Sequence, residues 1–141
     1  TLQETDVAPQ AIELEITESM AADDLSLIRQ RLDDIRALGL TVAIDDFGTG
    51  FSSLSVLRHL HAKRLKIDRS FIAEIEHDSR IARMVVQLGQ LLGMQVIAEG
   101  VETQAQRAML QAMGCDEGQG WLFAKPMKEG PLLTWLSQQD A

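Results

Sequence analysis

Apolar and polar positions alternate along the chain in two patterns, one typical of strands and one typical of helices. In residues 11–17, AIELEIT, the apolar side chains of Ile12, Leu14 and Ile16 recur at every second position, which predicts a strand. In residues 24–38 the apolar side chains recur at steps of three and four, which predicts an amphipathic helix.

The same alternation of strand-like and helix-like segments continues to the end of the chain. Further strands are predicted over residues 40–45, 63–68, 94–100 and 118–126, and further helices over residues 53–61, 79–93, 103–114 and 129–139. Strict alternation with short links is typical of a parallel sheet with helices packed outside it. We therefore predict an α/β fold in one domain with no internal boundary.

Residues at the ends of the helical segments support these boundaries. Gly93 and Gly114 stand where a helix C-terminus favours a left-handed residue. Thr103 is a predicted N-cap, and Asp23 or Asp24 could cap the first long helix. The caps thus agree with the hydrophobic pattern on where helices begin and end.

Composition and charge narrow the class of protein. The 141 residues are enough for one domain with a sizeable core, and 45% of them are hydrophobic. The formal net charge of -8 argues against nucleic acid and against an anionic membrane as partners. The single cysteine, Cys115, rules out a disulfide framework, and the chain shows no signal-peptide pattern and no apolar run long enough to cross a membrane. We therefore expect a cytoplasmic domain with no membrane contact from this segment.

Acidic residues cluster where the predicted strands end, which is where parallel α/β proteins place their chemistry. The first strand carries Glu13, Glu15 and Glu18, and the second ends in Asp45 and Asp46. The third ends in Lys66 and Asp68, and the fourth ends in Glu99, which Glu102 follows. The fifth carries Gln119, followed by Lys125 and Pro126. A single acid there could be an ordinary helix cap, as Asp46 or Glu102 alone would be. Acids at four consecutive strand ends favour a common site.

Clustered carboxylates repel one another, and a hard divalent cation relieves that repulsion. Oxygen ligands without cysteine point to magnesium, manganese or calcium. Adjacent Asp45 and Asp46 cannot point to the same face of a strand, but both could reach the site in the turn that follows it. They could then hold two metals, the usual clamp for phosphodiester hydrolysis, while Lys66 holds the attacking water or a phosphate oxygen. The histidines are expected at the surface and not as ligands: His59, His61 and His77.

The loop after the second strand, FGTGFSSLS, has the composition of a phosphate-binding turn. Gly48 and Gly50 allow close backbone approach, and Ser52 and Ser53 could cap the next helix, whose N-terminus favours an anion. An ordinary tight turn would have the same composition. The loop supports a phosphate-bearing ligand mainly because it follows two aspartates.

Five motifs resemble those of a known family. ELEITES, AIDDFGTGFSSL, LKIDRSF, VIAEGVET and QGWLFAKP are similar to the motifs of EAL domains, bacterial phosphodiesterases that linearise the second messenger cyclic di-GMP. They occur in the family's order over nearly the whole chain. The resemblance implies a parallel (β/α) TIM-like barrel of the EAL type, here an incomplete barrel of about five βα units. It also implies a two-metal site that uses Mg²⁺ or Mn²⁺.

The resemblance assigns roles residue by residue. The residues that resemble the family's metal ligands are Glu15, Asp45, Asp46 and Glu99. Those that resemble its catalytic residues are Lys66, Glu99 and Asp45; Lys66 matches the lysine that orients the hydrolytic water, and Asp45 the carboxylate that bridges both metals. Those that resemble its substrate contacts are Asp68, Gln119, Pro126 and Gly48. Glu18 resembles the glutamate that stabilises the loop after Asp46.

Two features of the family are absent from this chain. The Glu-Ala-Leu tripeptide is missing, and the metal-binding asparagine cannot be present, because the sequence contains no asparagine. Both belong to strands that precede ELEITES in the family, and a complete barrel typically needs about 250 residues. We therefore interpret residues 1–141 as the C-terminal portion of a single EAL domain. Alone, the chain is expected to be inactive, and its open sheet edges are expected to leave it oligomeric or partly unfolded.

The resemblance predicts metal-dependent hydrolysis of cyclic di-GMP to linear pGpG by the parent domain. The alternative is a degenerate EAL domain that acts as a cyclic di-GMP receptor or regulatory interaction module without hydrolysis. All metal and water residues expected in this part of the family are present, from Glu15 to Glu99, which favours the enzyme. A structural fragment without a ligand would predict random loss of these residues. The family also implies a homodimer and an upstream regulatory or GGDEF-type domain.

Overall fold

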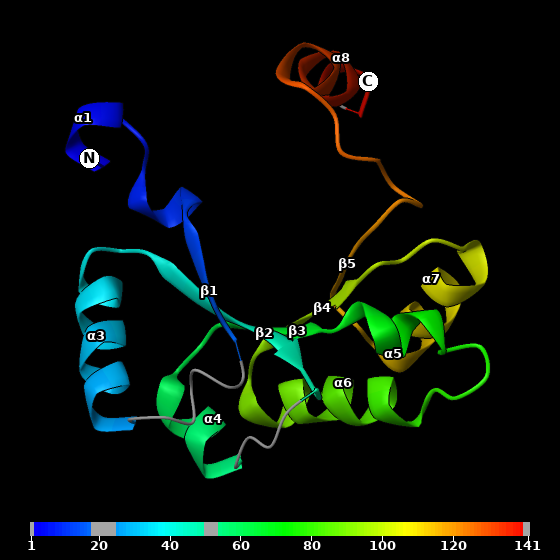
Figure 1. Ribbon diagram of the computed structural model, residues 1–141, viewed down its shortest axis with the longest axis horizontal. Coiled ribbons are helices and arrows are strands. Elements are labelled where there is room, and N and C mark those ends of the chain that lie inside the picture. The colour runs from blue at the N-terminus through cyan, green and yellow to red at the C-terminus, as the bar shows by residue number, and fades with distance from the viewer. Residues whose placement is uncertain (1, 18–24, 50–53, 140–141) are drawn as a thin grey trace.

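The computed structural model describes residues 2–17, 25–49 and 54–139, which contain one parallel sheet with its main helices on one side (Figure 1). The strands lie in the order β1-β2-β3-β4-β5, and every neighbouring pair is parallel. They are β1 (Glu13–Thr17), β2 (Thr41–Phe47), β3 (Arg64–Ile67), β4 (Gln95–Glu99) and β5 (Glu117–Gln119). Each strand therefore pairs with the next one in the sequence.

Helices connect the strands and cover one face of the sheet. The longer helices are α3 (Leu25–Ala37), α4 (Leu54–Leu60), α6 (Arg80–Leu92), α7 (Gln104–Met113) and α8 (Glu129–Gln139). The shorter ones are α1 (Leu2–Thr5), η1 (Pro9–Ala11) and α5 (Arg69–Ala73). In Figure 1, α3, α4 and α6 lie below the sheet, whereas α1 and α8 rise above it on either side.

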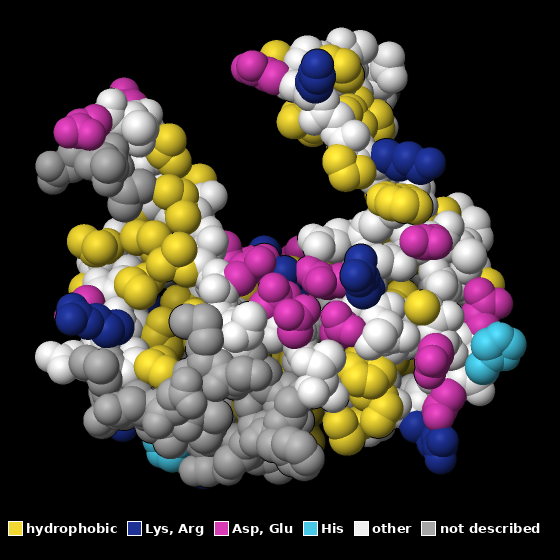
Figure 2. All heavy atoms as spheres, viewed as in Figure 1, with side chains coloured by type: hydrophobic (Ala, Val, Ile, Leu, Met, Phe, Trp, Pro, Cys, Tyr) yellow, Lys and Arg dark blue, Asp and Glu magenta, His cyan; other side chains and the backbone are white. Residues whose placement is uncertain are grey.

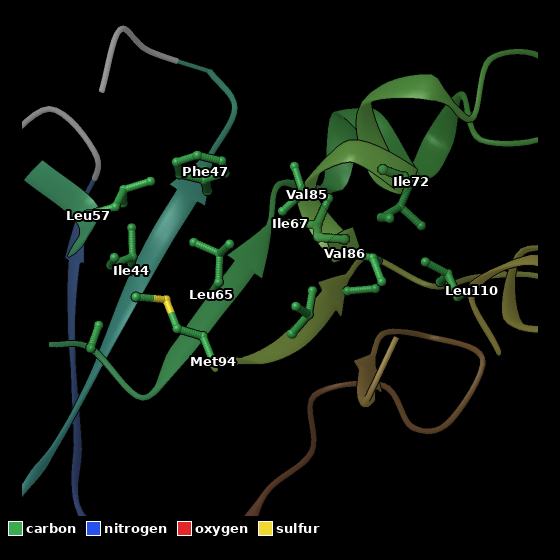
Figure 3. Close-up of a cluster of buried hydrophobic side chains, with 14 of the residues drawn as sticks. Ile44, Phe47, Leu57, Leu65, Ile67, Ile72, Val85, Val86, Met94 and Leu110 are labelled. Carbon is green, nitrogen blue, oxygen red and sulfur yellow. The ribbon is translucent and has the colours of Figure 1, made fainter. Parts of the chain in front are cut away.

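The helix-covered face of the sheet is apolar and forms the core (Figure 3). Along β2, β3 and β4 the strand residues buried there alternate: Val42, Ile44, Leu65, Ile67, Val96 and Ala98. The helix residues that pack against them include Leu32, Leu57, Val85, Val86 and Leu110. Because side chains alternate across a strand, the intervening residues, such as Lys66, point to the opposite face. The sheet is therefore apolar on one face and largely polar on the other.

The predicted alternation of strands and helices is confirmed, with shifts of a few residues at most boundaries. Thr103 caps α7 in a capping box, and Gly93 and Gly114 end α6 and α7 in the left-handed conformation, as predicted. The predicted caps Asp23 and Asp24 lie outside the described residues. Local patterns thus predicted the order of the five strands and of the longer helices correctly.

Three features differ from the prediction. The last predicted strand, residues 118–126, is only three residues long, because the chain turns after Gln119 and hydrogen-bonds back to Val101. The prediction lacks α5, which Asp68 caps by accepting a hydrogen bond from the backbone N–H of Ser70. It also lacks the short helices α1 and η1. The early end of β5 depends on a contact between distant residues, and the short helices have too few residues for a periodic pattern to show.

β1 and β5 are the edge strands, and each pairs with only one other strand in the part of the chain that the structure describes. These five strands do not close on themselves, in agreement with the predicted incomplete barrel. Among the described helices, none combines the length and the apolar character needed to span a membrane.

Gly89 allows α6 to lie directly on β4. A Cβ atom at this position would be 2.2 Å from Cγ2 of Val96, a fully buried core residue. We expect Gly89→Ala to lower the free energy of unfolding by about 1–3 kcal/mol, because overpacking outweighs the gain of up to ~1 kcal/mol in helix propensity. Urea unfolding of the intact protein that contains this chain measures the change.

Gly130→Ala is the matched control for this substitution. Gly130 is also in a helix, and apart from its chain neighbours and the nearby helix backbone no atom lies within 4 Å of the added Cβ. The gain in helix propensity is offset by the following Pro131, which disfavours a helical residue with a Cβ before it, so the control should change the free energy of unfolding by less than about 1 kcal/mol. Equal free energies of unfolding for Gly89→Ala and the unsubstituted protein would contradict the close packing of α6 on β4.

Candidate metal centre

A bulge in β2 places two adjacent aspartates at the same end of the sheet. The register of β2 against β3 shifts between Ile44 and Phe47, so that both aspartates lie opposite one residue of β3, Lys66. Asp46 has a φ of 53°, in the left-handed region that few residues other than glycine adopt. Asp45 and Asp46 therefore meet through a bulge within the strand, and the expectation that they meet in the following turn is wrong.

Three carboxylates converge at this point. One oxygen atom from each of Asp45, Asp46 and Glu99 lies within 4.8 Å of the other two. Figure 2 shows acidic side chains gathered over the middle of the sheet, between α1 on one side and α8 on the other. The C-terminal ends of β2 and β4 thus form an acidic cluster.

Lys66 is buried at the centre of this cluster. Its Nζ lies 2.6 Å from Oε1 of Glu15, 2.6 Å from Oε1 of Glu99 and 3.0 Å from Oδ1 of Asp45. Burial alone would lower the pKa of Lys66, but hydrogen bonds to these carboxylates outweigh burial and raise the pKa above its ordinary value. Lys66 is therefore protonated at neutral pH and serves as a fixed cation rather than a base.

Asp46 and Asp68 have pKa values shifted in opposite directions. Desolvation, together with the nearby charges of Asp45 and Asp68, raises the pKa of Asp46. Desolvation also acts on Asp68, but hydrogen bonds from the hydroxyl and the backbone N–H of Ser70 outweigh it and lower the pKa of Asp68. Asp46 therefore carries an unfavourable negative charge, which a neighbouring cation would stabilise.

Asp45 provides a test of whether these residues fit a metal ion. Its Oδ1 is buried and, within the described part of the chain, has no partner with full hydrogen-bond geometry; the Lys66 ammonium, 3.0 Å away, is the cation that stabilises it. The site thus already holds one cation against clustered carboxylates, which is the environment that a metal ion also stabilises. All donors in the group are carboxylate oxygens, which fit Mg²⁺ or Mn²⁺ better than a structural zinc.

A cavity of about 620 Å³ adjoins Glu99. Gln119, the last residue of β5, donates a hydrogen bond from Nε2 to Oε1 of Glu99 at 2.8 Å. Nζ of Lys125 lies 5.2 Å from the ring centroid of Trp121, which is 60% exposed. The lining also includes Pro126 and Arg69, the second of which sequence reasoning did not single out. An aromatic ring with two cations suits a ligand that has a planar base and a phosphate.

Gly120 is a second feature that sequence reasoning missed. A Cβ atom at Gly120 would lie 2.3 Å from the backbone nitrogen of Val101. The N–H of Val101 also donates to the carbonyl of Gln119 at 3.0 Å. This close backbone approach holds Gln119 beside Glu99. Its only sequence signal is the glycine that directly follows Gln119.

The other residues singled out from the sequence fall in different places. Glu15 contacts Lys66 at the same end of the sheet but lies outside the three-carboxylate cluster. Gly48 has a φ of 101°, and a Cβ atom there would be 2.8 Å from the ring of Phe71. The three histidines are exposed. The residues that lie outside the described part of the chain are Glu18, Gly50, Ser52 and Ser53.

Comparisons with known proteins agree on one family. The family model described as "EAL domain" matches residues 1–126. The bifunctional diguanylate cyclase/cyclic di-GMP phosphodiesterase MucR of Pseudomonas aeruginosa is 45% identical over 129 residues, which make up 89% of this chain and 19% of MucR. The chain therefore spans less than a fifth of that relative.

Two solved structures are similar to the chain. The structure titled "PaMucR Phosphodiesterase, c-di-GMP complex" matches with a TM-score of 0.89 and 43% identity, over 93% of this chain and 54% of that one. A manganese/cy-diGMP complex of Klebsiella pneumoniae BlrP1 matches with a TM-score of 0.80 and 34% identity, over 89% of this chain and 33% of that one.

Asp46 allows charge and backbone to be tested separately. Asp46→Asn removes the charge but keeps a residue that tolerates the left-handed conformation, whereas Asp46→Ala adds a backbone cost of about 1–2 kcal/mol. Because folding raises the pKa of Asp46, ionisation of this group destabilises the fold as the pH rises through that pKa. At pH 7 in EDTA we therefore expect Asp46→Asn to melt at or above the unsubstituted protein, and Asp46→Ala to melt below Asp46→Asn.

Thermal unfolding at several pH values checks this prediction. In acid, where Asp46 is protonated in both the folded and the unfolded chain, the advantage of Asp46→Asn should disappear. Added Mn²⁺ should raise the Tm of the unsubstituted protein more than that of Asp46→Asn. Asp34→Asn, at an exposed position of α3, is the control. A Tm for Asp46→Ala equal to that of Asp46→Asn would contradict the strained backbone at this position.

Proposed function

We propose that this chain, which belongs to the EAL domain family, is the C-terminal portion of a domain that hydrolyses cyclic di-GMP to linear pGpG. Its five parallel strands correspond to part of an EAL-type barrel. The observation that carries the proposal is the bulge that brings Asp45 and Asp46 together with Glu99 around the protonated Lys66. The name of MucR and the manganese/cy-diGMP complex of BlrP1 support the substrate and the metal.

The carboxylates are the proposed metal ligands. Asp45 has a buried oxygen that faces the Lys66 ammonium and lies near both other members of the cluster, so we assign it the bridging position. Asp46 is the proposed ligand of the second ion, and Glu15 and Glu99 are the further ligands. When bound, Mg²⁺ or Mn²⁺ ions supply a Lewis acid and lower the pKa of a coordinated water.

Lys66 is the residue proposed to orient the attacking water. Its raised pKa keeps it cationic, so it can donate hydrogen bonds but cannot accept a proton at neutral pH. Its Nζ lies within 3.0 Å of both Asp45 and Glu99, which places the donor beside the proposed ligands. The same charge would stabilise a phosphate oxygen that approaches the acidic cluster.

The cavity beside Glu99 is the proposed site for part of the dinucleotide. The proposed substrate contacts are Gln119, Pro126, Asp68 and Gly48. Arg69 and Lys125 give the cavity local positive charge, although the chain as a whole has a net charge of -8. An anionic substrate is therefore compatible with this acidic protein.

The context of the domain is also a proposal. MucR combines two activities in its name, which supports an upstream regulatory or GGDEF-type domain in the parent of this chain. We propose that the parent acts as a homodimer. The chain alone lacks the Glu-Ala-Leu glutamate and the asparagine of the family, so hydrolysis is expected only from the complete domain.

Asp45→Asn tests the bridging role in the intact protein that contains this chain. Removal of a carboxylate that serves both metals should lower the kcat for pGpG formation by more than about 100-fold in Mg²⁺ or Mn²⁺. Chromatography of the nucleotide products measures the rate, and Asp34→Asn is the control. If the unsubstituted protein binds cyclic di-GMP and leaves it intact, the receptor function is correct and the proposed hydrolysis is wrong.

Lys66→Met tests the role of the buried cation. Loss of a donor to the attacking water should lower kcat by about 10²–10³-fold and change KM much less. Lys63→Met, an exposed lysine just before β3, removes the same charge and should leave kcat unchanged. A large rise in KM with an unchanged kcat would assign Lys66 to substrate binding instead.

A further inference from the structure

The polar face of the sheet carries a second charged group, at the opposite end of the strands from the metal centre. Arg64 of β3 lies there, with Nη1 3.3 Å from Oε1 of Glu13 in β1 and Nη2 3.2 Å from Oε1 of Glu117 in β5. Its Nε donates to Oε1 of Gln95 in β4 at 3.4 Å. Arg64 therefore contacts three strands besides its own.

These contacts reach both edge strands. β3 is the middle strand, so Arg64 extends across one intervening strand in each direction. On the β1 side, the Thr41 hydroxyl also donates to Oε2 of Glu13, at 3.3 Å. A guanidinium donates from a wide, rigid planar fork, whereas a lysine ammonium is a compact point charge, so the guanidinium can hold partners that lie far apart. One side chain thus holds β1 and β5 toward the centre of the sheet.

Strand geometry connects this group to the candidate metal centre. Glu13 and Glu15 are two residues apart in β1, and Arg64 and Lys66 are two residues apart in β3, so each pair shares one face. Arg64–Glu13 and Lys66–Glu15 are therefore parallel ion pairs between the same two strands. The side chain of Glu15 is 47% exposed, and the Arg64–Glu13 pair ties its strand to β3 two residues away, which restricts where Glu15 can lie.

We propose that Arg64 is a positioning residue for the metal centre. Its ion pair with Glu13 restrains β1, and this restrains Glu15 in the same strand. Its contacts with Gln95 of β4 and Glu117 of β5 hold the guanidinium in place. The effect on metal binding rests on the proposed function; the restraint of β1 rests on the contacts alone. Both ion pairs are partly exposed and add little to global stability, so the effect falls on the position of β1.

Hydrogen exchange in the intact protein that contains this chain tests the restraint. In Arg64→Met the backbone amides of β1 should exchange several-fold faster, while those of β4 keep their rates. Glu13→Gln, which leaves Arg64 in place, should reproduce the effect. Arg83→Met removes one positive charge from an exposed position of α6 and should leave β1 unchanged. Unchanged exchange of β1 in Arg64→Met overturns the proposal.

Titration with Mn²⁺ tests the consequence for the metal centre. Arg64→Met should raise the Kd for Mn²⁺ about tenfold, as loss of a supporting residue does at other metal sites. In a Glu15→Gln background the same substitution should change Kd by less than about twofold, because the carboxylate that Arg64 positions is gone. The Kd of Arg64→Lys for Mn²⁺ should lie between the values for the unsubstituted protein and for Arg64→Met.

A general loss of folding would weaken Mn²⁺ binding equally in both backgrounds, and that result overturns the positioning role. If the unsubstituted protein does not bind Mn²⁺, the proposed function fails. The hydrogen-exchange comparison of Arg64→Met with Arg83→Met still decides whether Arg64 restrains β1. The two proposals can therefore fail separately.

Discussion

The ammonium group of Lys66 is buried on the polar face of the sheet, and its ion pairs join strands that are otherwise held by backbone hydrogen bonds. Its carboxylate partners come from three strands: Glu15 from β1, Asp45 from β2 and Glu99 from β4. Burial of a charge costs several kcal/mol unless paired charges offset it. This charge therefore couples the positions of all three strands to β3, most strongly through Asp45 and Glu99, whose side chains are less exposed than that of Glu15. The residues of the candidate metal centre therefore also help to hold the strands of the sheet in place.

The two faces of the sheet contribute differently to stability. The helix-covered face is a continuous apolar core in which residues such as Ile44 and Leu65 are fully buried. The polar face contains a left-handed Asp46, whose carboxyl pKa is raised. A non-glycine residue in this backbone conformation costs on the order of 1–3 kcal/mol. The conformation persists because burial on the opposite face holds the same strand in place.

Local patterns in the sequence predicted most of the fold and the composition of the site. A hydrophobic period of two residues indicates a strand, and a period of three to four residues indicates a helix, whatever elements lie beside them. The same boundaries show which acids stand at the strand ends. The bulge could not be predicted, because it is a register shift of β2 against β3. The early end of β5 depends on a backbone contact with Val101, and the reach of Arg64 depends on which strands lie on either side of it. Local patterns do not show which strands are neighbours or in what register they pair.

The three clustered carboxylates and Glu15 occupy different positions in the sheet. Asp45, Asp46 and Glu99 lie on β2 and β4, and each of these strands is paired on both sides. Glu15 lies on β1, which among the described residues pairs with β2 alone. Side-chain ion pairs from β3 also restrain β1, through Lys66 at one end of the strand and through Arg64 and Glu13 at the other. An additional strand paired with β1 would supply the missing backbone restraint. The geometry of Glu15 is accordingly the part of the site that depends most on closure of the sheet.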